Sequence, residues 1–132
     1  MKYQHLITPG ASVPLSTVPF HHDAPLTRYV MLQKDQMQGD GGFRVVSHVI
    51  HTLPTVIPPY CELHWHDFDE INLILSENNS LRYRIKLEDE TYEVTSPSTV
   101  YIPKGMKHSA EVISGTGIYV AITFTKDYKA QQ

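Results

Sequence analysis

The chain has 132 residues, 41% of them hydrophobic, and a formal net charge of −3. Its length fits one domain with a single core, and its weakly acidic composition without a basic tract argues against binding to nucleic acid. No run of eighteen apolar residues and no leader pattern occurs, so we expect no membrane span and a cytoplasmic protein, which the single cysteine also fits.

Residues 1–39 contain four prolines and no sustained hydrophobic period, which predicts an extended N-terminal arm with one short strand. We expect this arm to pack on the rest of the protein or on a partner subunit. Asp40-Gly41-Gly42 indicates a turn that opens a β-barrel domain, residues 40–132. Strand signals recur in this domain, with almost no helix signal, at 43–51, 60–66, 70–76, 81–87, 91–95, 99–102, 109–113 and 117–125. The pattern predicts an all-β sandwich or closed barrel.

His64 and His66 form the strongest functional signal, because alternate residues of a strand point to one face. Their Cα atoms should lie about 6.6 Å apart, so both imidazoles can reach one ion. A turn at Asp67-Phe68-Asp69 would bring Glu70 to the same interior, and His108 would arrive from a strand distant in sequence. Three imidazoles and one carboxylate suit a divalent transition metal, and iron, manganese, nickel, cobalt and zinc are all compatible with this ligand set.

The same residues carry a resemblance to the cupin family, whose motifs are HxH followed by Glu, and PxGxxH. The metal-binding positions of these motifs match His64, His66, Glu70 and His108. Pro103 and Gly105 match the turn before the last histidine, whereas Glu77 and Pro97 replace two glycines that are usual in the family. The resemblance covers about residues 42–126. It implies a double-stranded β-helix, the jelly-roll or cupin barrel, with a metal ion held inside.

Further pocket residues follow from the same alternation of side chains. Counting back by twos from the motif histidines predicts that Tyr60 and Glu62 face the interior and that Cys61 faces outward. We expect Tyr60 or Glu62 to move protons in a catalysed reaction, and Asn72 and Tyr101 to line the pocket. The alternative for each tyrosine is a structural role, in which the ring packs and the hydroxyl is hydrogen-bonded.

The remaining histidines are expected to lie outside the metal site. His5, His21 and His22 precede the barrel segment and are not expected to be ligands. His48 and His51 lie on the strand before the first motif, where ordinary strand residues are the favoured interpretation and contacts to the ligands are the alternative.

The outer face of the strand that follows the first motif is expected to be apolar. If Glu70 points inward, then Ile71, Leu73 and Leu75 point outward. Apolar area left in water costs about 25 cal/mol for each Å², so something should cover this face. We expect the N-terminal arm or a second copy of the chain to do so, and the small cupins that this chain resembles imply a homodimer.

Two classes of function remain open. The first is a metal-dependent enzyme acting on a small oxygenated or anionic metabolite, similar to the dioxygenase, lyase and isomerase members of the cupin family. The second is a non-catalytic module that binds or senses a small molecule or sugar. The intact ligand set favours the enzyme, and a dication with one carboxylate leaves a positive centre that favours an anionic or oxygen-rich substrate.

Overall fold

The computed structural model describes residues 1–33 and 42–132, and the regular elements of these residues are nearly all short strands. The strands are β1 (Ala11–Ser12), β2 (Thr27–Leu32), β3 (Arg44–Ile50), β4 (Glu70–Leu75), β5 (Arg82–Leu87), β6 (Glu90–Thr95), β7 (Ser98–Ile102), β8 (His108–Ser114) and β9 (Gly117–Thr123). Two 3-10 helices, Gln4–Leu6 and Leu15–Thr17, are the helical elements of the described residues. Neither is long enough to cross a bilayer.

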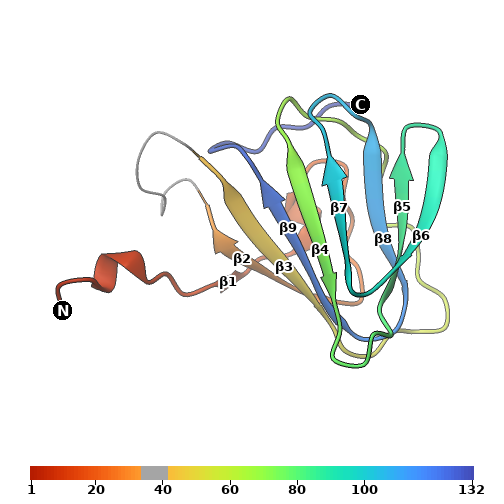
Figure 1. Cartoon of the computed structure of the whole chain (residues 1–132), viewed down its shortest axis with the longest axis horizontal. Helices are drawn as coiled ribbons and strands as arrows, with labels where there is room; N and C mark the ends of the chain where they lie inside the picture. The colour runs from red at the N-terminus through yellow and green to blue at the C-terminus, as the bar shows by residue number, and fades with distance from the viewer. Residues whose placement is uncertain (34–41) are drawn as a thin grey trace.

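The strands form two antiparallel sheets that face each other, as Figure 1 shows. The larger sheet has six strands in the order β1-β2-β3-β9-β4-β7, and the smaller sheet has three in the order β6-β5-β8. The expected all-β class and double-sheet barrel are therefore confirmed. The expected domain boundary after residue 39 and the turn residues Asp40 and Gly41 lie outside the described residues.

Seven of the eight expected strands are present, with ends within two residues of the expected positions. The expectation of a strand over 60–66 is wrong, because this segment makes only isolated bridges, at Cys61, His64 and Trp65. Pro58 and Pro59 precede it and have no backbone N–H to extend a ladder. The rule that alternate residues share a face therefore does not hold between Tyr60 and His64.

The N-terminal segment contributes more structure than the single short strand expected. β1 pairs with β2, and β2 pairs along most of its length with β3, so both strands extend the six-stranded sheet. Leu15 is buried in the hydrophobic core between the sheets. Residues 1–10, in contrast, project from the body of the molecule, as Figure 1 shows. The segment around Leu15 thus closes one side of the sandwich.

The inward face of β4 is polar at one end and apolar at the other. Glu70 and Asn72 are buried at the end next to the motif histidines, and Ile74 is buried in the hydrophobic core. Tyr83 and Ile85 of β5 face the same core, as the alternation with Arg82, Arg84 and Lys86 predicts. One end of the sandwich is therefore a packed core, and the other end is a polar site.

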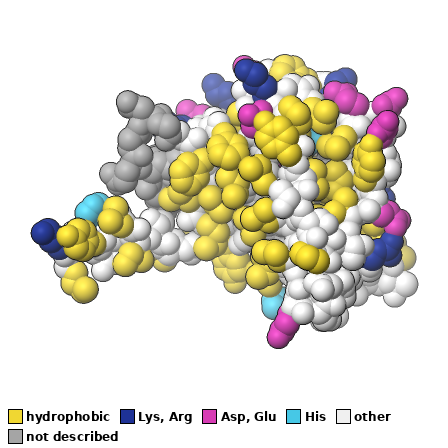
Figure 2. All heavy atoms as spheres, in the orientation of Figure 1, with side chains coloured by type: hydrophobic (Ala, Val, Ile, Leu, Met, Phe, Trp, Pro, Cys, Tyr) yellow, Lys and Arg dark blue, Asp and Glu magenta, His cyan; other side chains and the backbone are white. Residues whose placement is uncertain are grey.

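The outward face of the six-stranded sheet is apolar, as expected. Register places Ile71, Leu73 and Leu75 beside Ile122, Val120 and Ile118 of β9. Figure 2 shows hydrophobic side chains gathered over β3, β9 and β4. Leu75 is 48% exposed and Ile118 is 42% exposed, and the N-terminal segment leaves this face open.

Candidate metal centre and its cavity

Backbone hydrogen bonds bring the two histidine-bearing segments together. The His64 N–H donates to the His108 carbonyl oxygen at 3.1 Å, and the His108 N–H donates back to His64 at 2.8 Å. Gly105 N–H donates to the His66 carbonyl oxygen at 2.8 Å. Gly105 has a φ of 85°, which favours glycine at the turn before His108. The PxGxxH turn thus places His108 beside His64 and His66.

Local hydrogen bonds orient all three imidazole rings. Each Nδ1 lies within hydrogen-bonding distance of a carbonyl oxygen two positions away, His64 with Glu62 at 2.7 Å, His66 with Phe68 at 2.9 Å and His108 with Met106 at 2.9 Å. A carbonyl oxygen can only accept, so each Nδ1 carries the proton and each Nε2 has a free lone pair. The three ligand nitrogens lie within 4.8 Å of one another. The rings are therefore arranged as metal ligands before any ion binds.

Glu70 completes the donor set. Its Oε1 lies 2.9 Å from His66 Nε2 and 3.7 Å from His108 Nε2, and its Oε2 accepts a hydrogen bond from Asn72 Nδ2 at 2.7 Å. Two lone-pair atoms at 2.9 Å require a cation or a proton between them. His108 Nε2 is buried without a hydrogen-bond partner among the described residues. These observations fit a divalent metal ion held by His64, His66, Glu70 and His108.

Burial sets the charge state of the ligands. It lowers the pKa of His64 to about 4 and also lowers the pKa of His108, so both imidazoles are neutral near pH 7. Burial acts to raise the pKa of Glu70, but the contacts of its carboxylate with His66, His108 and Asn72 outweigh burial and lower that pKa. Neutral imidazoles and an ionised carboxylate are the forms that coordinate a metal.

A cavity of about 70 Å³ adjoins the candidate metal centre. Its lining includes His64, Glu70, His108, Tyr60, His21, Cys61, Arg28, Arg44, His48, Tyr119, Thr123 and Tyr128. Tyr60 lies inward as expected, but its hydroxyl accepts a hydrogen bond from Val112 N at 2.7 Å. Burial raises the pKa of Tyr60, so this hydroxyl stays protonated.

Three other expectations for the pocket turn out differently. The expected inward direction of Glu62 is wrong, because its side chain is 50% exposed and pairs with His22 at 3.1 Å on the surface. The expected outward direction of Cys61 is also wrong, since Cys61 lines the cavity. Tyr101 is 55% exposed, outside the cavity. Asn72 is buried and acts through Glu70. Proton transfer by Tyr60 or Glu62 stays a prediction.

Several cavity residues were not expected from the sequence. The expectation that His21 lies outside the site is wrong, because its ring centroid lies 5.1 Å from that of His64 and its Nε2 lies 3.2 Å from Cys61 Sγ. His21, Cys61 and His64 form a second group whose ligand atoms lie within 4.8 Å of one another. Burial raises the pKa of the Cys61 thiol to about 12. An isolated bridge between His21 and Cys61 holds this corner together.

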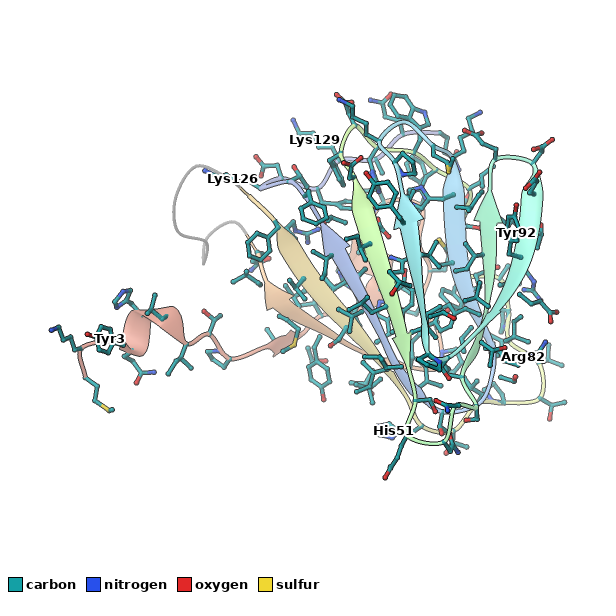
Figure 3. All side chains as sticks on the ribbon, viewed as in Figure 1. Tyr3, His51, Arg82, Tyr92, Lys126 and Lys129 are labelled. Atoms are coloured by element: carbon teal, nitrogen blue, oxygen red, sulfur yellow. The ribbon has the colours of Figure 1, made fainter. Side chains whose placement is uncertain are left out.

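The C-terminal segment supplies a further cavity residue, Tyr128. Backbone hydrogen bonds of 2.8 Å in both directions join Trp65 and Gln131, so this segment lies beside the first motif. The Tyr128 hydroxyl lies 3.3 Å from His64 Nε2. His51, for which contact with the metal ligands was the alternative, does not reach the site. It is exposed at the end of the sandwich opposite Lys129, as Figure 3 shows. No spacing in the sequence marks Tyr128, which lies beyond the last expected strand, 117–125.

No protein-family model and no curated protein matches the amino-acid sequence. Solved structures do match the fold. The polyketide cyclase RemF from Streptomyces resistomycificus aligns with a TM-score of 0.62 and 14% identity, over 96% of this chain and 80% of that chain. A cupin 2 domain-containing protein from Halorhodospira halophila aligns with a TM-score of 0.60 and 15% identity, over 81% of this chain and 69% of that chain. This chain has the cupin fold.

A third cupin, the oxalate decarboxylase of Bacillus subtilis described with Mn(II) centres, aligns with a TM-score of 0.59 and 15% identity. It covers 95% of this chain, which spans 33% of the decarboxylase. At these identities the similarity shows the shared fold alone, and a polyketide cyclase and an oxalate decarboxylase catalyse different reactions. The function of this chain therefore has to be argued from its own residues.

Proposed function

We propose that this protein is a metal-dependent enzyme that acts on a small oxygenated or anionic metabolite. The observation that carries the proposal is the convergence of three Nε2 atoms, each with its tautomer set by a backbone carbonyl, beside Glu70 and a cavity. A structural role for a buried histidine requires no such common orientation. Among cupin reactions, a dioxygenase, a lyase or an isomerase fits this site.

His64, His66, Glu70 and His108 would hold the metal, which when bound supplies Lewis-acid polarisation of a substrate oxygen and open positions for a second ligand. Asn72 orients Glu70 through the hydrogen bond to Oε2. Phe68 stacks on His66 with ring centroids 4.0 Å apart and limits rotation of that ring. Burial raises the pKa of Tyr128, so its hydroxyl stays protonated, and this hydroxyl lies 3.3 Å from His64 Nε2 at the cavity wall.

Metal-dependent turnover is the first test of this function. Protein stripped with a chelator should regain one equivalent of Fe(II), Mn(II), Ni(II), Co(II) or Zn(II), and one loaded form should convert a small carboxylic acid from a panel. Product formation and oxygen consumption are measured together, because oxygen uptake separates a dioxygenase from a lyase or isomerase. Stoichiometric metal with binding of an acid but no turnover by any loaded form would instead indicate the non-catalytic binding module.

We also propose that the protein is a homodimer that buries the outward face of the six-stranded sheet. The support is the continuous apolar row formed by Ile71, Leu73, Val120 and Ile122, which the N-terminal segment leaves open. Apolar faces of this kind in soluble proteins mark sites of association. A two-fold contact would bury the same face on both copies.

Val120→Glu should convert such a dimer into a monomer. The substitution places a charge without a partner at the centre of the buried face, and the dimer dissociation constant should rise at least about 100-fold. Sedimentation equilibrium measures this change, with Tyr92→Glu on the exposed face of β6 as the matched control. A parent protein that sediments as a monomer at all concentrations would contradict the dimer.

A further inference from the structure

The cavity wall next to the metal ligands carries two arginines that the proposed metal chemistry does not use. β2 and β3 place Arg28 beside His48, which faces inward next to Tyr119 of β9. A second row across the same sheet joins Arg44, Thr123 and Glu70. All of these side chains line the cavity. Strands lie about 4.8 Å apart, so the backbone of Arg44 lies about 10 Å from that of Glu70.

Arg28 is buried, but not all of its hydrogen-bond donors have acceptors among the described residues. It is 6% exposed, and its NH1 donates to the Val13 carbonyl oxygen at 3.3 Å, whereas its Nε is buried without a hydrogen-bond partner among the described residues. Both ring nitrogens of His48 are also buried without a described partner. Buried donors of this kind are almost always satisfied in folded proteins. Two of them side by side in a cavity indicate a missing polar ligand.

The charges around the cavity give the sign of that ligand. Burial, and after it the positive charge of Arg44, lowers the pKa of Arg28, yet a guanidinium stays charged at all ordinary pH values. Arg44 in turn lies over the Tyr128 ring, with its Cζ 5.3 Å from the ring centroid. Of the described residues that line the cavity, Glu70 alone carries a carboxylate, and it belongs to the metal ligands. Burial lowers the pKa of Arg44, and Tyr128 and the carboxylate of Asp127 act to raise it. Within the described cavity lining, two guanidinium groups therefore face one carboxylate, and the excess positive charge lies at Arg28.

We propose that Arg28, with Arg44 and His48 beside it, binds the carboxylate of a small carboxylic acid whose second oxygen function reaches the metal centre. Guanidinium groups match carboxylates in shape and hydrogen bonding, and buried pairs of this kind are strong. The cavity of about 70 Å³ limits the acid to a few carbon atoms. The substrate class named here rests on the proposed function, whereas the anion site itself is a property of the metal-free chain.

Malonate and its neutral diamide, malonamide, are suitable probes because they differ in charge and little in size. Calorimetric titration of the metal-free protein should show binding of malonate at least about 10-fold tighter than binding of malonamide. Arg28→Gln should weaken malonate binding about 10- to 100-fold, since it removes hydrogen bonds to a charged group. Arg44→Gln should also weaken it, which tests the site if Arg28→Gln does not fold.

The matched control is Arg82→Gln, because Arg82 lies on the β5–β6 side of the sandwich and pairs with Glu93 at the surface (Figure 3). This variant should bind malonate like the parent. Equal binding of malonate by the parent and both cavity variants, or no preference for malonate over malonamide, would overturn the anion site. Metal content is measured on the same samples. Malonate binding without metal uptake would leave the anion site standing and refute the metal-dependent function.

Discussion

Replacing His66 with alanine should abolish stoichiometric metal binding and leave the metal-free fold intact. His66 is buried, and its Nε2 faces Glu70 at 2.9 Å, so the substitution removes one ligand from the middle of the set. Loss of a residue that merely orients a ligand costs 10- to 100-fold in metal affinity, so loss of a ligand itself should cost at least about 100-fold. Titration with Zn(II) or Co(II) against a competing chelator measures the change.

His51→Ala is the control for this experiment, because His51 is exposed at the far end of the sandwich. It removes an imidazole without touching the site, and its metal affinity should equal that of the parent. Far-ultraviolet circular dichroism of both metal-free variants should match the parent, since the core at Ile74 and Tyr83 is untouched. A His66→Ala protein that binds metal as tightly as the parent would show that the ligand assignment is wrong.

The ligand set could be predicted from the sequence because its geometry is local. His64 and His66 are two residues apart, Glu70 begins the next strand, and the Pro103–Gly105 turn positions His108. Each imidazole is oriented by a carbonyl only two residues away. Spacing along the chain therefore contains almost all of the information that the metal centre needs.

The cavity wall could not be predicted in the same way, because its polar residues occupy inward positions of strands, where the pattern of alternation expects apolar residues. In β2, Arg28 occupies an inward position that an apolar residue would fill in an ordinary strand. His48 does the same in β3. Inward polar residues hide the alternation that marks a half-buried strand, so the sequence predicts only an extended arm where β2 forms. The rule of alternation failed at Glu62 for another reason, since the segment after Pro59 is not a regular strand.

Acid should destabilise the metal-free protein, with His48 as a major cause. Burial lowers the pKa of His48 from 6.5 to about 3, and the neighbouring charge of Arg28 acts in the same direction. Below pH 6.5, His48 therefore binds a proton in the unfolded chain, whereas in the folded protein it binds this proton only near pH 3. The unfolded state binds more protons in this interval, so the free energy of unfolding falls as the pH falls, by up to about 1.4 kcal/mol per unit for one such group.

His48→Phe should flatten this dependence. Phenylalanine keeps an aromatic ring against Tyr119, whose ring centroid lies 5.2 Å from that of His48, but it has no proton to gain. Urea unfolding between pH 6 and pH 4, with chelator present, should give a slope of unfolding free energy against pH that is lower by about 1 kcal/mol per unit than in the parent. His64 and His108 titrate in both proteins, so the difference between the two slopes isolates His48.

His51→Phe is the control, because it makes the same substitution at an exposed histidine. Its slope of unfolding free energy against pH should equal that of the parent. Identical slopes for His48→Phe and the parent would mean that His48 is solvated or hydrogen-bonded in the folded protein. That result would also remove one of the two unsatisfied groups of the cavity wall, Arg28 and His48, because a hydrated His48 has no need of a ligand. The acid slope thus reports on the same cavity wall that the anion titration probes, through a group that carries no charge when the fold is intact.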